Sequence, residues 1–283
     1  MRINNNMMAQ NTHRQLGNAT QAGARSMEKL SSGMRINRAG DDAAGLSISE
    51  KMRGQIRGLN QASRNAQDGI SLIQTAEGAL DESHNILQRM RELAVQGSND
   101  TNHDNDREAI ANEMNELIEE LDRIADNTEF NEKELLDGSL DSDDDGDSIN
   151  FQIGANANQK MTLEIKDMGT EGLEIHELAV LGDDADALSH TNFESAIENI
   201  QGAIEKVSAQ RSELGAAQNR LEHTISNLDN ASENLQAAES RIRDVDMAAE
   251  MMEQTKQGIL EQASTAMLAQ ANMAPQNVLQ LLG

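Results

Sequence analysis

Cysteine, tryptophan and tyrosine are absent from this chain of 283 residues, which has only three phenylalanines and one proline. The lack of cysteine excludes disulfide bonds and thiol chemistry. The lack of large aromatic side chains leaves Leu, Ile, Val, Met and Ala to form any core, and these suit narrow seams between helices better than a thick globular interior. Because proline breaks helices and occurs only at Pro275, we predict an elongated, mainly helical protein.

Long apolar runs are missing as well. The first ten residues, Met1–Gln10, have no continuous apolar core of the kind that a Sec-type signal peptide needs. Residues 262–283 carry no charge, but their Gln and Asn side chains and Pro275 are unfavourable in hydrocarbon. We therefore predict no membrane insertion, a buried protein–protein seam near the C-terminus, and a dedicated export machine if the protein leaves the cell.

The net charge of −26 is placed unevenly. Residues 1–43 sum to +3 and residues 254–283 to zero, whereas residues 44–253 sum to −29. This partition favours an assembly in which the two ends pack together and the middle faces solvent, since so large a charge would not be held in a dry interior. The acidic, lysine-poor middle indicates a haloalkaliphile-like surface, and a merely soluble acidic protein is the plainer alternative.

Apolar residues recur in steps of three and four over three long stretches, which is the spacing of one helix face. They predict helices over about 44–96, about 106–127 and 197–242, the last with a seam over six heptads that indicates coiled-coil packing. The first seam is rich in small residues that let a partner helix approach: Leu59, Ala62, Ala66, Ile73, Ala76, Leu80, Leu87, Met90 and Ala94. We predict an elongated antiparallel helical bundle or coiled coil.

The period changes in the middle of the chain. Ser148–Ile153 and Met161–Ile165 alternate between apolar and polar residues, and a turn-like segment separates them, so the sequence predicts a small β-hairpin region. The two ends, 1–30 and 255–283, have scattered apolar residues that cannot bury enough surface alone to offset their ordering entropy. We predict that both ends are disordered in the monomer and helical in the assembly.

One acidic loop invites a metal-site hypothesis. Asp141, Asp143, Asp145 and Gly146 match positions 1, 3, 5 and 6 of a calcium loop. Position 12, where a bidentate Glu is needed, is Gln152, so an acidic surface turn is the alternative and any calcium site would be weak.

The sequence contains no motif typical of catalysis or of nucleic-acid binding. His176-Glu lacks the second histidine of a zinc peptidase, and no motif places a base beside a nucleophile. The basic residues between 25 and 38 are followed by Asp41 and Asp42, and no aromatic platform for base stacking accompanies them. We therefore predict no enzyme activity, no cofactor and no nucleic-acid partner.

Both ends of the chain resemble one family. The segment Lys29–Met52, with Leu-Ser-Ser-Gly-Met-Arg-Ile-Asn-Arg-Ala-Gly-Asp-Asp inside it, resembles the N-terminal signature of bacterial flagellins, and Ser240–Met251 and Asn277–Leu282 resemble the C-terminal one. The resemblance implies a structural subunit of the extracellular bacterial flagellum, exported unfolded and self-assembling into a helical filament for swimming motility. Only about 60 residues separate the helical arms, so the form is near-minimal.

The resemblance implies a division of the chain. Residues 1–43 and 254–283 would form the inner filament core, residues 44–129 and 190–253 the outer-tube helical bundle, and residues 130–189 the short central region. It also implies inter-subunit packing in a spoke-like turn and at the C-terminus, by Arg35, Asn37, Asp41, Asp42, Val278, Leu279, Leu281 and Leu282.

Partners follow from the same resemblance. They are further copies of the chain, the flagellar export apparatus and an export chaperone, and the filament cap and hook–filament junction proteins. Residues 88–96 resemble the helix segment of flagellins that host innate-immune receptors recognise. The matching positions are Arg89 and Leu93 and, on the next predicted helix, Glu113. Two alternatives remain at this point: a hook–filament junction protein, which has similar termini, and a soluble coiled-coil scaffold.

Overall fold

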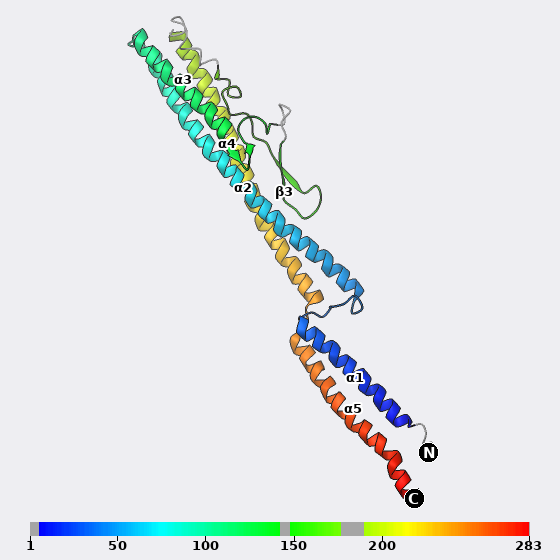
Figure 1. The fold of residues 1–283 in the computed structure, drawn as a ribbon. Helices are drawn as coiled ribbons and strands as arrows, with labels where there is room; N and C mark the ends of the chain where they lie inside the picture. The colour runs from blue at the N-terminus through cyan, green and yellow to red at the C-terminus, as the bar shows by residue number, and fades with distance from the viewer. Residues whose placement is uncertain (1–5, 142–147, 177–189, 283) are drawn as a thin grey trace. The chain divides into compact units, whose positions relative to one another are not determined.

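The computed structural model of the chain describes residues 6–141, 148–176 and 190–282, with side chains of 192–274 in the last range. The helices are α1 (Met7–Ser32), α2 (Ala43–Gly97), α3 (Asp104–Asn127), α4 (His190–Arg243) and α5 (Met247–Leu282) (Figure 1). The strands form two antiparallel pairs, β1 (Glu129–Phe130) with β2 (Lys133–Glu134), and β3 (Ile149–Gln152) with β4 (Lys160–Leu163). The prediction of a mainly helical chain with a small β-hairpin region is confirmed.

The chain divides into two compact units. The first joins residues 1–56 to residues 233–283 and holds α1 and α5. The second, residues 57–232, holds α3, both strand pairs and most of α2 and α4. Among the described residues, no helix is both long enough and apolar enough to cross a lipid bilayer.

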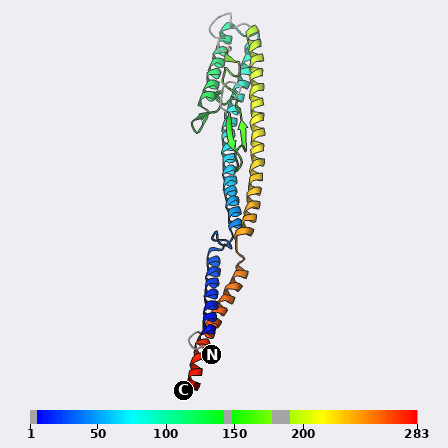
Figure 2. The same cartoon turned by 90° about the vertical axis from the view of Figure 1, so that its right-hand side faces the viewer.

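In the first unit, α1 and α5 lie side by side in both views (Figure 1, Figure 2). They are antiparallel: Asn6 donates to the Ala271 carbonyl at 2.7 Å, while Gly23 faces Gln257. The Asn6 side chain also accepts from the Ala9 N–H and caps the start of α1. Gly33 ends α1 with a φ of +70°, a left-handed conformation that costs glycine little.

In the second unit, α2, α3 and α4 pack around one apolar core. The predicted seam of α2 is buried from Ala62 to Ala94, as its three-four spacing requires. On α4 half of the prediction needs correction. Ile200, Val207, Leu214 and Leu221 are buried as predicted, whereas Ile197, Ile204 and Ile225 are only half-buried at the flank. Between the correctly predicted positions, the buried stripe takes residues one position earlier than predicted: Ala196, Ala203, Gln210 and Ala217. The alanines at 196, 203 and 217 are small enough to let the helices approach closely.

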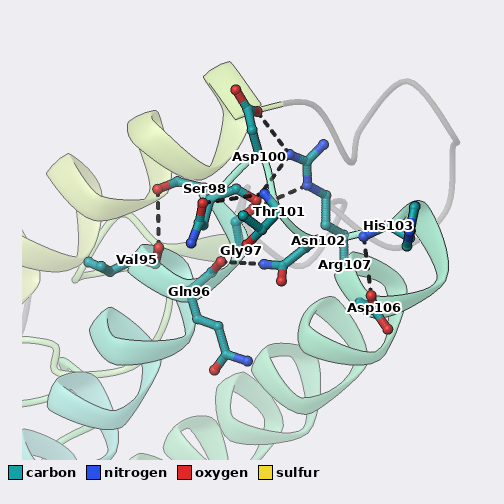
Figure 3. A network of polar contacts seen from close by, with 11 residues as sticks. Val95, Gln96, Gly97, Ser98, Asp100, Thr101, Asn102, His103, Asp106 and Arg107 are labelled. Atoms are coloured by element: carbon teal, nitrogen blue, oxygen red, sulfur yellow. Dashed lines mark hydrogen bonds and ion pairs between the residues drawn. The ribbon is translucent and has the colours of Figure 1, made fainter.

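The turn between α2 and α3 is closed by polar contacts (Figure 3). Arg107 donates from Nε to the Gly97 carbonyl at 3.2 Å and pairs with Asp100, and Asn102 donates to the Gln96 carbonyl. The Asp106 carboxylate accepts from the His103 N–H at 3.1 Å at the start of α3. These hydrogen bonds satisfy backbone carbonyl and amide groups that the ends of α2 and α3 leave without partners, and they hold the turn between the two helices in one conformation.

The β3–β4 hairpin lies against α2 through glycines. A β-carbon at Gly58 would come within 2.8 Å of the Ala155 β-carbon, and one at Gly69 within 3.1 Å of the Phe151 ring. Asn65 donates to the Gln152 carbonyl at 3.1 Å between these two contacts. The hairpin was predicted from sequence, whereas the short β1–β2 pair was not, since two-residue strands are too short to show a period.

Candidate functional site

The segment after α1, residues 33–42, is bound to the segment between α4 and α5. The Val245 N–H donates to the Gly33 carbonyl at 3.0 Å, and Met34 forms a β-bridge with Asp244. Arg35 donates from its backbone N–H to the Arg243 carbonyl and from its guanidinium to the Ile242 carbonyl, both at 2.6 Å. The two flagellin-like segments of the sequence, from opposite ends of the chain, therefore meet in one unit.

Each of the four predicted turn residues, Arg35, Asn37, Asp41 and Asp42, makes a hydrogen bond within the chain. Asp41 Oδ2 accepts from the N–H groups of Asn37 at 3.2 Å and Arg38 at 2.9 Å. These two backbone bonds, first Arg38 and then Asn37, hold the pKa of Asp41 below its ordinary value of 3.8. Asp42 Oδ1 accepts from the Gly45 N–H at 2.9 Å, which caps the first turn of α2.

Residues that the sequence did not single out complete this turn. Glu28 accepts from Asn37 Nδ2 at 2.9 Å and from Arg38 Nε at 2.8 Å. Arg243 donates to Glu50 at 2.7 Å and to the sulfur of Met34 at 3.2 Å. Arg243 belongs to the C-terminal flagellin-like segment, so its place in that motif was the signal that could have found it.

The α1–α5 pair has a second feature, a concentration of exposed apolar side chains. Among the described residues, ten of the twelve exposed large apolar side chains lie on these two helices. We call them the terminal apolar face: Met7, Met8, Met27, Met247, Met251, Met252, Ile259, Leu260, Met267 and Met273. The predicted contacts Val278, Leu279, Leu281 and Leu282 lie on the last turns of α5, where side chains are outside the described residues.

The residues that match the receptor-recognised part of flagellins lie partly at the surface and partly in the core. Arg89 on α2 pairs with Glu113 on α3 at 2.9 Å, and both side chains are about half exposed. The hydrogen bonds that Arg89 donates to Glu113 and, less strongly, to Glu92 raise the pKa of Arg89. Leu93 is only 2% exposed and packs in the core, so a partner at this place would meet Arg89 and Glu113 but not Leu93.

Asp141 of the calcium-like loop is buried, with 9% of its surface exposed. Asp143 and Asp145 lie outside the described residues. Within the parts of the chain that the structure describes, no group of three or more His, Cys, Asp or Glu residues is placed to hold a metal ion.

Comparison with known proteins gives two family matches. Residues 3–141 match the bacterial flagellin N-terminal helical region, and residues 197–282 match the bacterial flagellin C-terminal helical region. Both segments that form the bonded turn fall inside these ranges.

Relatives match over the whole chain. A flagellin of Halalkalibacterium halodurans is 61% identical over 282 residues, and one of Bacillus subtilis is 55% identical over 303 residues, each covering all of both chains. The structure of a protein described as a flagellar hook-associated protein from Vibrio parahaemolyticus aligns with a TM-score of 0.60. It covers 72% of this chain and all of its own at 12% identity, so it shows a shared fold alone.

Proposed function

Because this chain belongs to the bacterial flagellin family and is a structural subunit of the extracellular flagellar filament, we propose that α1 and α5 supply the surface through which its subunits join. The observation that carries this proposal is the terminal apolar face. Burying one side chain of this size contributes about 1.5–3 kcal/mol, so ten exposed together favour association strongly.

The charge distribution supports the same assignment. The excess of −29 lies in residues 44–253, whereas residues 1–43 and 254–283 sum to +3 and zero. Subunits can therefore bring α1 and α5 into close contact with less repulsion than the middle of the chain would cause. The contacts would be heterologous, with different patches meeting on successive subunits, and such contacts extend into an open helical filament.

Removal of residues 254–283 tests the proposal. We expect the truncated chain to stay unpolymerised in sedimentation while circular dichroism reports a folded helical second unit. A second test keeps the chain at full length. The test variant carries Met251→Ser and Met252→Ser on α5, and the control variant carries Val95→Ser, which replaces a comparably exposed apolar side chain in the second unit. Loss of polymerisation only in the α5 variant supports the proposal, and filaments from the truncated chain would overturn it.

Export in an unfolded state is the second part of the proposal. With no cysteine and one proline, the chain can refold after threading without disulfide formation or repeated prolyl isomerisation. The flagellar export apparatus and an export chaperone would then be partners of the unassembled chain. Refolding kinetics from denaturant test this: a dominant phase as slow as prolyl isomerisation would contradict it.

The filament cap and hook–filament junction proteins are the partners proposed for the two filament ends. The shared fold of the hook-associated protein suits such contacts, since similar helical termini can pack in one lattice. A junction protein as this chain's own identity is not favoured, because its full-length relatives at 55–61% identity are flagellins.

A host innate-immune receptor remains a proposed partner of the surface around Arg89 and Glu113. The supporting observation is that α2 and α3 present these two charges together as an exposed pair. In a receptor reporter assay, Arg89→Ala should weaken the response, whereas Arg123→Ala, which removes another exposed arginine paired with Glu120, should not. Equal responses from both variants would remove this proposal.

A further inference from the structure

Twelve of the fifteen methionines fall into two groups. Met90, Met114, Met161 and Met168 in the second unit are at most 3% exposed. The eight methionines of the terminal apolar face are 47–71% exposed. Exposed thioethers are therefore gathered on the same two helices that carry the proposed joining surface.

Solvent access decides which methionines an oxidant reaches. Hydrogen peroxide oxidises a thioether when sulfur attacks one peroxide oxygen: an S–O bond forms, the O–O bond breaks, and the departing oxygen leaves as water after taking a proton. Sulfur gives up two electrons and the product is a sulfoxide, which is polar where the methionine was apolar. The absence of cysteine means that no thiol competes for the oxidant within the chain.

We propose that the exposed methionines of α1 and α5 form an oxidation site that controls whether an unassembled subunit can join the filament. The inference rests on the proposed function, because the sulfoxides act by placing polar groups in the joining surface. Met247 and Met251 lie four residues apart on one face of α5 and Met252 follows Met251, so oxidation there makes three neighbouring exposed side chains polar.

The second unit is protected by its packing. Its four buried methionines lie in or against the apolar core, and reaching them requires local opening of that core. Met34, in the first unit, is half-buried, and its sulfur accepts from Arg243 Nε. Mild oxidation should therefore change the terminal helices and leave the second unit folded.

The test treats the full-length unassembled chain with hydrogen peroxide and locates sulfoxides by peptide mass mapping. We expect modification first at the eight exposed methionines, an unchanged circular dichroism spectrum of the second unit, and a critical concentration for polymerisation raised by about tenfold or more. Methionine sulfoxide reductase with a dithiol reductant should restore polymerisation. Filaments treated after assembly should be modified more slowly at the same positions.

Two variants sharpen the test, each compared with its own untreated sample. A chain with Met247, Met251 and Met252 replaced by Leu should lose much of its peroxide sensitivity, whereas Met114→Leu, which removes a buried thioether, should keep it. Oxidised wild type that polymerises like untreated protein, or first oxidation at Met90 and Met114, would overturn the inference. If untreated wild type does not polymerise through α1 and α5, the proposed function fails instead.

Discussion

The ring of Phe193, near the start of α4, covers Gly97 at the end of α2 so closely that a β-carbon at Gly97 would come within 2.5 Å of it. Phe193 is fully buried. Gly97→Ala must therefore displace a packed aromatic ring, and we expect a loss of stability of about 1–3 kcal/mol. The midpoint of urea unfolding, followed by circular dichroism, measures it.

Gly78→Ala is the matched control for that substitution. Gly78 lies inside α2, and a β-carbon there meets nothing within 4 Å. Alanine is the better helix former by about 1 kcal/mol, so this variant should be as stable as the wild type or more so. Similar losses in both variants would mean that the Phe193 contact is not the cause.

Asp42 carries the second prediction. Because its carboxylate caps α2 through the Gly45 N–H, Asp42→Ala should cost about 1 kcal/mol of stability in the isolated subunit. We also expect altered filament shape or blocked assembly, since the surrounding turn resembles the flagellin spoke. Filament waveform by electron microscopy and the thermal unfolding midpoint of the subunit are the two measurements.

The substitution Asp42→Asn distinguishes the helix-capping role of this side chain from the role of its negative charge. Asparagine caps helices about as well as aspartate, so the subunit should regain its stability. If the carboxylate charge pairs across subunits, the Asn filaments remain abnormal. Normal filaments and swimming in both variants would identify the turn as a plain linker.

The third prediction concerns ionic strength. Subunits that each carry −29 in residues 44–253 repel one another, and the screening length falls from about 30 Å at 0.01 M salt to about 3 Å at 1 M. We expect polymerisation to accelerate with sodium chloride over that range, as measured by light scattering on seeded filaments. A flat or falling rate would show that this acidity does not limit assembly.

The fourth prediction concerns the loop that begins at Asp141. Asp141 is buried, and the calcium-loop pattern lacks its final Glu. Calorimetry should therefore find no saturable calcium site tighter than about 1 mM. A stoichiometric site in the micromolar range that disappears in Asp141→Asn would contradict this and restore the metal hypothesis.

Most of the fold prediction came from the regular spacing of apolar residues along the chain. It placed α2 within one residue of its observed bounds and identified its buried stripe, because a long seam of small apolar residues allows one helix face inward. On α4 it named Ile197 and Ile204, whereas Ala196 and Ala203 occupy the buried positions. Where two helices approach closely, the alanine fits between them and the neighbouring isoleucine does not, and the spacing of apolar residues alone does not show this.

The sequence by itself determined the helical class, because missing aromatics and periodic aliphatic residues leave few other folds. The residues of the two terminal segments by themselves carry the flagellin resemblance. Tertiary structure decided which groups meet: Arg35 with the carbonyls of Ile242 and Arg243, and Arg89 with Glu113, with Leu93 withdrawn into the core. Such contacts depend on how helices distant in sequence are placed against one another, and that placement is set by packing that no local pattern records.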